Sequence, residues 1–291
     1  AEYVKNLQNG LKRRMKNVKL RILRSDGGLA SAKASSDSPV NLLMSGPAGG
    51  VSGAIWIAKQ AGFENLMTFD MGGTSTDVSL VKNGVAEQSR ETSVGDVTVR
   101  ASSVDVRTVG AGGGSIAWVD KGGLLRVGPE SAGSNPGPAC YDKGGIKPTV
   151  SDANLVLGYL NPEGLVGGKL PLNYDNAFQA IKKDIADPLN LSVETAAYGM
   201  FTIVNSNMVN GIRKVTVERG YDPRDFVLVA GGGATGAHIT SLAKEMGIKT
   251  VIVSKLSSGL CAYGQIISDV KYNYMATIPI RLDAKEASEK I

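Results

Sequence analysis

The longest regular pattern of apolar residues lies in the last third of the chain. Between residues 193 and 219, apolar side chains recur every three or four positions, which is the spacing of one helix face. Ser192 precedes this pattern as a good N-terminal cap, and Gly220 follows it as a stop signal. The pattern predicts one long helix with a buried apolar stripe.

Short apolar runs in the first third of the chain predict strands. Residues 66–69 are apolar and lead directly into a polar stretch at 70–77. Residues 78–81 and 85–92 continue the pattern, and Asn83-Gly84 between them is a strong hairpin signal. We therefore expect an antiparallel meander whose first turn carries the polar stretch.

The segment before this meander is expected to contain a strand, a turn and a helix. Residues 40–44 form a short apolar run, the glycine-rich residues 45–50 are typical of a tight turn, and residues 51–60 have helical spacing.

Strands and helices alternate after the long helix. Strands are predicted at 226–230 and 250–254, and helices at 237–246 and 260–268. Such alternation implies parallel strands with glycine-rich connections at their carboxyl ends. The fold class expected is α/β.

The middle of the chain, from about residue 94 to residue 171, is rich in loops. Within it, residues 114–120 and 124–127 predict a hairpin, and Ser151-Asp152 predicts the start of a helix that runs to residue 159. A further amphipathic helix is expected at 174–186.

Composition and charge exclude several classes of protein. The chain has 291 residues, of which 42% are hydrophobic and 20% charged, which suits one large domain or two modest ones. Its net charge of +5 is spread out, and the basic cluster at residues 12–16 is typical of a solvated helix face, so we expect no nucleic-acid partner. No apolar run approaches the roughly 20 residues of a membrane span, so no membrane partner is expected.

The cysteine and histidine content narrows the chemistry further. Cys140 and Cys261 lie far apart, without the spacing of a metal knuckle or a redox pair, which favours reduced thiols in the cytoplasm. A single histidine, His238, argues against a histidine-built metal site and a Ser-His-Asp triad.

The stretch from Asp70 to Asp77 is the strongest candidate for chemistry. Gly72 and Gly73 allow backbone amides to close on an anion without a Cβ in the way. The three residues between Gly73 and Asp77 carry hydroxyl donors: Thr74, Ser75 and Thr76. Asp70 and Asp77 are carboxylates suited to Mg²⁺. No lysine follows the glycines, so this is not a Walker loop, and the alternative is a plain hairpin turn.

A second glycine-rich strand end follows at Gly231, Gly232 and Gly233. A strand, three glycines and a helix suit a backbone packed against a planar ligand or a phosphate, although close strand–helix packing is an equal alternative. Two such strand ends in one chain are able to face each other across one cleft.

The order of these motifs resembles a known ATPase fold. A hairpin of the Asp-Gly-Gly-Thr type, a long helix and a strand ending in three glycines look like the second half of the actin-like (ribonuclease H-like) ATPases, which include actin, Hsc70 and the sugar kinases. More closely, five segments resemble the hydantoinase A family of ATP-dependent hydantoinases, 5-oxoprolinases and acetone and acetophenone carboxylases: residues 44–51, 69–80, 109–119, 128–141 and 148–157. The residues at 258–264 look more like the ketone carboxylase branch.

Two departures from that family affect the interpretation. The family's first phosphate loop, a second Asp-x-Gly-Gly-Thr, is absent, so half of the phosphate clamp is expected from another subunit or from a missing N-terminal domain. The glycine loop before His238 is also one residue longer than the family pattern.

The resemblance implies an enzyme component that binds Mg-ATP and phosphorylates the carbonyl or enolate oxygen of a small substrate. Asp70 and Asp77 would act in catalysis and hold the metal. The hairpin residues 72–76 would bind phosphate, and Gly231, Gly232 and Gly233 would hold the adenosine. Catalysis by this chain alone is not expected. The alternative is a non-catalytic assembly or regulatory subunit with a degenerate half site.

These predictions divide the chain into four parts. Residues 1–37 are expected to complete a preceding domain. Residues 38–94 and 191–275 form the nucleotide-binding core, residues 95–190 form a loop-rich inserted subdomain, and residues 276–291 form a C-terminal extension or linker.

Four lesser candidates have structural explanations beside functional ones. Cys140 has no positive neighbour in sequence, which favours an inert thiol. Asp152 is expected to cap a helix. His238 is either a hydrogen-bonded structural group or a substrate contact, and the glycine-rich loop at residues 110–114 is either mobile or closely packed.

Overall fold

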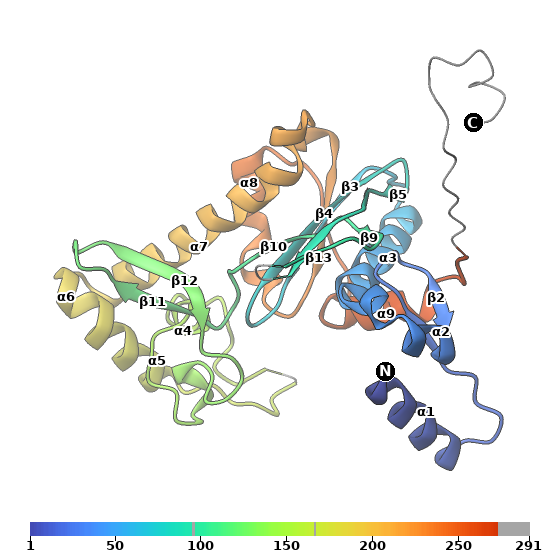
Figure 1. Ribbon diagram of the computed structural model, residues 1–291. Helices are drawn as coiled ribbons and strands as arrows, with labels where there is room; N and C mark the ends of the chain where they lie inside the picture. Colours follow the sequence, from blue (N-terminus) through green and yellow to red (C-terminus); the bar gives the residue numbers. More distant parts are fainter. Residues whose placement is uncertain (95–96, 166, 273–291) are drawn as a thin grey trace.

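The computed structural model describes residues 1–94, 97–165 and 167–272, and its centre is a mixed six-stranded sheet (Figure 1). The strand order is β10-β4-β3-β13-β14, with β5 paired to the end of β4. These strands are β3 (Leu66–Met71), β4 (Thr76–Lys82), β5 (Val85–Ala86), β10 (Arg107–Val109), β13 (Val227–Gly231) and β14 (Val251–Val253).

Strand direction divides this sheet into two halves. β3, β13 and β14 are parallel, whereas β4 pairs antiparallel with β3, β5 and β10. The parallel strands predicted for the last third are therefore confirmed, and so is the first hairpin of the meander. The third strand, predicted at residues 85–92, is shorter than expected: β5 stops at Ala86. The next strand, β6 (Gln88–Ser89), pairs with β9 (Ser103–Val104) outside the central sheet.

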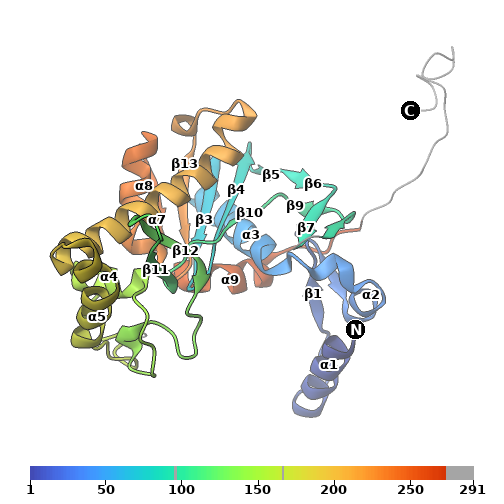
Figure 2. The ribbon, with the colours of Figure 1, turned by 60° about the vertical axis from the view of Figure 1, so that its left-hand side comes forward.

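Helices cover both faces of the sheet (Figures 1 and 2). α7 (Val193–Val215) and α8 (Ile239–Met246) pack on one face, where alternate residues of β3 such as Phe69 join the larger apolar core. α3 (Ser45–Gln60) and α9 (Leu260–Ile267) cover the other face. The result is an α/β fold with a mixed sheet, consistent with the expected actin-like ATPase half.

The long helix α7 begins where its sequence predicts, but its α-helical part ends four residues before the predicted end at Arg219. Ser192 accepts a hydrogen bond from the Thr195 backbone amide at 3.2 Å, as an N-cap does. The α-helix ends at Val215, and a 3₁₀ turn over Val217–Arg219 leads to Gly220, whose φ of +80° is the left-handed conformation of a helix stop.

The expectation for residues 40–50 was wrong. Residues Pro39–Leu42 form a 3₁₀ turn instead of a strand, and α3 begins at Ser45 instead of Val51. The glycines that suggested a turn lie inside α3 because α9 approaches it closely. A Cβ on Gly49 would lie 2.6 Å from the Cys261 carbonyl oxygen, and one on Gly53 would lie 2.8 Å from that of Leu260. These glycines allow two helices to pack backbone to backbone.

The segment 95–190 shares its core with α7. The predicted hairpin is present as β11 (Ser115–Val119) and β12 (Leu125–Ser131), and α4 (Val150–Val156) packs beside it on α7. α5 (Tyr174–Ile181) continues through a π turn (Lys182–Ala186) into α6 (Asp187–Leu189). Since β10 also comes from this segment and joins the central sheet, we keep the four-part division as a proposal.

The remaining elements are short or peripheral. They are α1 (Glu2–Arg14), β1 (Arg21–Leu23), β2 (Leu29–Ser31), α2 (Ala32–Asp37), β7 (Thr92–Val94), β8 (Val97–Val99) and 3₁₀ turns at Ala139–Tyr141, Pro223–Asp225, Thr235–Ala237 and Ser257–Gly259. The proposed extension at 276–291 lies outside the described residues. Within the described ranges, none of the helices is both long enough and apolar enough to cross a membrane.

Candidate functional site

Two strand ends meet at one edge of the central sheet. β3 and β13 are parallel neighbours, and Gly231 at the end of β13 stands in register with Asp70 near the end of β3. The predicted motifs therefore lie side by side on adjacent strands, although their sequences also allowed them to face each other across a cleft. Loops at the carboxyl ends of parallel strands are where open α/β sheets bind ligands.

The hairpin between β3 and β4 places its two carboxylates together. Asp70 and Asp77 stand directly opposite each other in the antiparallel register, an arrangement that separates Cβ atoms by about 5 Å. The turn is closed by the Gly72 amide, which donates to the Ser75 carbonyl oxygen at 3.0 Å. Both aspartates are partly buried, whereas Gly73 and Thr74 are exposed at the tip.

The three glycines after β13 differ in their surroundings. A Cβ on Gly231 would lie 3.0 Å from the Asp70 carboxylate, and one on Gly232 would overlap the Met71 carbonyl oxygen. Gly232 also has a φ of +81°. Gly233 is exposed and has no atom within 4 Å of its Cβ position. Gly231 and Gly232 thus allow the loop to pack on the hairpin, and Gly233 borders open space.

Sequence reasoning did not identify the role of Thr235. Its hydroxyl accepts the Met71 backbone amide at 2.9 Å and donates to the Gly231 carbonyl oxygen. The Ala234 amide donates to the Met71 carbonyl oxygen at 3.1 Å. These bonds tie the glycine loop to the end of β3. Only the position of a threonine soon after a glycine triplet pointed to such a tie.

The loop at residues 110–114 is closely packed beneath the hairpin. The amides of Gly113 and Gly114 donate to the carbonyl oxygens of Gly72 and Gly73 at 3.0 and 2.6 Å. A Cβ on Gly112 would lie 2.7 Å from backbone atoms of Thr74. The loop therefore holds the hairpin turn from behind, which resolves the two alternatives that the sequence left open.

Thr76 belongs to this support as well. Its side chain is fully buried, and its hydroxyl donates to the Ala111 carbonyl oxygen at 2.6 Å. Its Oγ1 is also 3.6 Å from the Met208 sulfur of α7, on the face of the sheet opposite α3. The expectation that Thr76 binds phosphate does not fit this placement, because its side chain points toward α7 whereas Asp77, the next residue of the strand, points to the opposite face of the sheet.

Burial and charge act together on the two aspartates. Burial raises the pKa of Asp70, and a hydrogen bond from the Cys261 thiol partly offsets this effect. Burial likewise raises the pKa of Asp77, the 2.6 Å hydrogen bond from the Thr108 hydroxyl lowers it, and the nearby charge of Asp70 raises it. Two like charges held together in a partly desolvated place favour a bound cation.

Cys261 lies next to this pair. Its sulfur is 3.1 Å from Asp70 Oδ2. Burial and the adjacent carboxylate of Asp70 raise the pKa of the Cys261 thiol to about 12, so it remains protonated at neutral pH and is the donor in this contact.

His238 is part of a buried structural network. Its Nε2 accepts from the Asn154 amide at 2.9 Å, its Nδ1 lies 2.7 Å from Asn205 Oδ1, and Phe201 stacks on the ring with centroids 4.9 Å apart. The side chain is completely buried, and both ring nitrogens are satisfied in the neutral form that carries its proton on Nδ1. This geometry favours the structural alternative for His238.

The burial of His238 predicts a pH dependence of stability. Burial lowers its pKa from 6.5 to about 4, so the unfolded chain binds the extra proton first as the pH falls. The free energy of unfolding should be fully retained above pH 6.5 and should lose about 3 kcal/mol from this group as the pH falls to about 4.

This expectation is measurable on one resolved signal, because the chain has a single histidine. Nitrogen-detected NMR should show the Nδ1–H form and a pKa near 4. Urea unfolding of a His238→Gln variant should lack the corresponding part of the pH dependence. A measured histidine pKa near 6.5 would contradict the account.

Asp152 and Cys140 are also structural. Asp152 is buried in the capping box of α4, whose N-cap is Thr149, two positions earlier than the sequence suggested. Its carboxylate accepts from the Thr149 hydroxyl at 2.7 Å and from the Cys140 amide at 2.7 Å. Cys140 is completely buried, and burial raises the pKa of its thiol, which makes it inert as expected.

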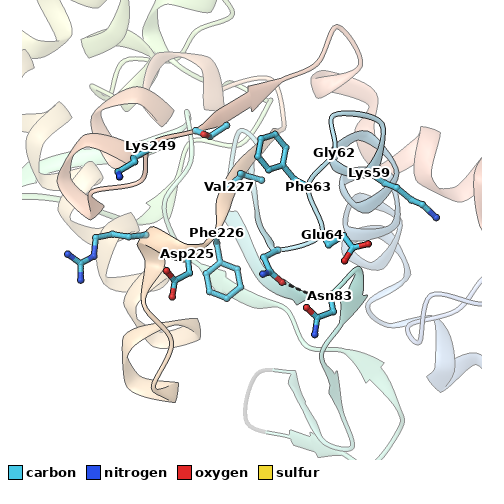
Figure 3. Close-up of a pocket in the computed structure, with 12 residues that line it drawn as sticks. Lys59, Gly62, Phe63, Glu64, Asn83, Asp225, Phe226, Val227 and Lys249 are labelled. Carbon is cyan, nitrogen blue, oxygen red and sulfur yellow. Dashed lines mark hydrogen bonds between the residues drawn. The ribbon is translucent and has the colours of Figure 1, made fainter.

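A surface hollow of about 600 Å³ lies at the opposite edge of the sheet (Figure 3). It is bordered by the residues that precede β3 and β13, among them Glu64, Asp225 and Phe226, and by Asn83 of the β4–β5 turn. Lys59 and Lys249 lie at its rim and point away from it. Because the amino ends of the strands meet here, this hollow is separate from the Asp70 hairpin.

Comparison with known proteins places the chain in one family. The family model for hydantoinase/oxoprolinase proteins matches residues 1–274. The chain is 50% identical over 263 residues to the caprolactamase subunit alpha of Pseudomonas jessenii, covering 90% of this chain and 38% of that subunit. It is 34% identical to the acetone carboxylase beta subunit of Xanthobacter autotrophicus, covering 95% of this chain and 38% of that subunit.

Solved structures agree with this result. The nucleotide-free structure of an acetone carboxylase matches with a TM-score of 0.84 and 34% identity, covering 93% of this chain and 38% of that one. The structure of the ATP-dependent caprolactamase from Pseudomonas jessenii matches with a TM-score of 0.82 and 46% identity, covering 93% and 39%. This chain spans about two fifths of the length of these relatives. It belongs to the hydantoinase/oxoprolinase family.

Proposed function

We propose that this chain provides one wall of the ATP site in an enzyme that activates a carbonyl compound, either a cyclic-amide hydrolase or a ketone carboxylase. The relatives support this class: one is an ATP-dependent caprolactamase, and another takes part in ATP-dependent acetone carboxylation. The reaction would transfer a phosphoryl group from ATP to a carbonyl or enolate oxygen of a small substrate.

The observation that carries the proposal is the meeting of two strand ends. The Asp70–Asp77 hairpin and the Gly231 loop lie on adjacent strands, and the loop packs directly on the Asp70 carboxylate. One edge therefore offers exposed hairpin residues for phosphate and an open backbone at Gly233 for the adenosine. Positioning and neutralisation of charge are what phosphoryl transfer mainly requires.

The donor set suits a magnesium ion bound together with phosphate. Among the described residues no group of three or more histidine, cysteine or acidic side chains is gathered as a metal site. Mg²⁺ is commonly held by one or two carboxylates plus substrate phosphates and water, and the paired Asp70 and Asp77 match that requirement. When bound there, the ion would neutralise charge on the phosphates.

The residues of the chain have distinct parts in this proposal. Thr74 and Ser75 would present hydroxyl donors at the hairpin turn, the Gly72 amide closes the turn, and the exposed Gly73 keeps its backbone accessible. Thr76 and the loop at residues 110–114 hold the turn in place. The opposite side of the phosphate clamp would come from another segment or from a partner subunit, and the enzyme would work in the cytoplasm.

Titration calorimetry tests this proposal on the intact protein that contains the chain. We expect Mg-ATP to bind to the wild-type protein. Asp70→Ala should weaken that binding about tenfold or more, which is the usual effect of disturbing a metal site. Binding that is unchanged in the variant would contradict the proposal and favour a non-catalytic assembly role for this half of the fold.

A further inference from the structure

The thiol of Cys261 touches the carboxylate to which we assign the metal. Cys261 is the second residue of α9, and its sulfur lies 3.1 Å from Asp70 Oδ2. We infer that Cys261 is a positioning residue, which rests on the proposed function: its S–H group holds Oδ2 of Asp70 and so presents Oδ1 to the metal and nucleotide.

The surroundings of Asp70 explain why a positioning group is needed. Three glycines line the carboxylate: Gly50 on α3, Gly231 at the end of β13, and Gly232, on which a Cβ would lie 2.6 Å from Asp70 Oδ1. A Cβ on Gly50 would lie 3.4 Å from Asp70 Oδ2, and one on Gly231 would lie 3.0 Å from the same oxygen. Glycine has no side chain that could fix the rotamer of Asp70. Among the described residues, the hydrogen bond from Cys261 is the directional contact on the Asp70 carboxylate.

Gly50 also makes room for the thiol itself. A Cβ at this position would lie 3.0 Å from the Cys261 sulfur, which is closer than such atoms normally approach. α3, α9 and β13 thus converge on one carboxylate, where glycines leave space and one thiol donates a hydrogen bond.

The backbone that carries Cys261 is itself held firmly. A Cβ on Gly264 of α9 would overlap the carbonyl oxygen of Gly49, so the two helices approach through their backbones. Trp56 of α3 and Tyr263 of α9 add an edge-to-face contact with ring centroids 5.3 Å apart. A donor on an element fixed in this way positions its partner more precisely than one on a free loop.

The test measures metal binding directly, by electron paramagnetic resonance of Mn²⁺ in the presence of ADP, with the intact protein. We expect Cys261→Ala to raise the dissociation constant for Mn²⁺ about tenfold, the typical cost of losing a group that orients a metal ligand. Cys261→Ser keeps a donor at the same place and should restore most of the affinity. Cys261→Val, which has similar bulk and no donor, should behave like Cys261→Ala.

A matched control separates the role of this thiol from the loss of any buried cysteine. Cys140→Ala removes the other cysteine, which is buried next to α4, and should leave Mn²⁺ binding unchanged even where it lowers the unfolding temperature. If Cys261→Ala does not fold, Cys261→Val provides the same comparison.

Two results would overturn the inference. One is Mn²⁺ affinity of Cys261→Ala and Cys261→Val equal to that of the wild type. The other is a Cys261→Ser variant that binds Mn²⁺ as weakly as Cys261→Ala, because the sulfur would then act through its volume and not as a hydrogen-bond donor. The Asp70→Asn variant tests the proposed function separately from the role of Cys261. Undiminished Mn²⁺ binding in that variant would contradict the assignment of the metal to Asp70, whatever the cysteine variants do.

Discussion

Replacing Asp70 by asparagine should slow turnover sharply and at the same time stabilise the fold. The variant keeps the size of the side chain and an oxygen for the Cys261 thiol, but it loses the negative charge. We expect the rate of ATP-dependent turnover to fall about 10²–10³-fold, the usual effect of removing one group that stabilises transition-state charge.

The stability should move in the opposite direction. Because burial raises the pKa of Asp70, its charged form is disfavoured in the folded chain, and this cost is present at every pH above the ordinary carboxyl range. The neutral asparagine removes the cost, so the unfolding temperature at pH 7 should rise. Stability that is sacrificed at a site is typical of a functional residue.

Asp187→Asn is the matched control for this experiment. Asp187 is an exposed aspartate on α6 that pairs with Lys182 at 2.7 Å. Surface pairs of this kind contribute about 0–1 kcal/mol, so turnover should not change. An Asp70→Asn protein that keeps wild-type turnover would contradict the assignment, and one that unfolds at a much lower temperature would indicate a purely structural carboxylate.

The second large effect is expected at Gly232, where the glycine loop packs on the hairpin. A methyl group there would overlap the Met71 carbonyl oxygen, and the φ of +81° is unfavourable for alanine. We expect Gly232→Ala to lower the free energy of unfolding by at least about 2 kcal/mol, since backbone overlap adds to a strain of about 1–3 kcal/mol. Nucleotide affinity should fall with it.

Gly233→Ala separates packing from binding. Its Cβ would meet no atom within 4 Å, so urea unfolding should show a stability change within about 0.5 kcal/mol. The added methyl group nevertheless enters the space assigned to the adenosine, and calorimetry should show weaker nucleotide binding. A Gly232→Ala variant as stable as the wild type would contradict the packing, and undiminished binding by Gly233→Ala would contradict the adenosine assignment.

The hairpin was predictable because it has a strong local signal, whereas the glycine triplet alone fitted close strand–helix packing equally well. An apolar strand, a glycine-rich turn and a second strand identify the Asp70 hairpin without any tertiary information. The alternation of strands and helices after α7 also implied that β13 and β14 would be parallel, as they are. The sequence did not show that the hairpin and the glycine loop lie on adjacent strands, since the pairing of strands far apart in the chain depends on the whole sheet.

Thr76 shows a signal that was available but not used. Residues on a strand alternate between its two faces, so Thr76 and Asp77 cannot both face one ligand. Once Asp77 is assigned to the ligand side, Thr76 must point toward α7, where its hydroxyl meets the Ala111 carbonyl oxygen.

The α3 glycines illustrate a limit of local reasoning. Gly46, Gly49 and Gly50 are typical of a turn when only their neighbours in sequence are considered. The actual role of Gly49 and Gly50 comes from α9, more than 200 residues away in the chain, which needs glycines to approach, whereas a Cβ on Gly46 would meet no atom within 4 Å. The same distance in sequence hid the contact between Cys261 and Asp70.

A crystal structure of the intact protein with Mg²⁺ and a non-hydrolysable ATP analogue tests the central claim most directly. The account predicts phosphate oxygens against the hairpin at residues 72–75, the metal beside Asp70 and Asp77, and the adenosine along Gly233. A nucleotide bound elsewhere, for example in the hollow between Glu64 and Asp225 at the opposite edge of the sheet, would contradict it.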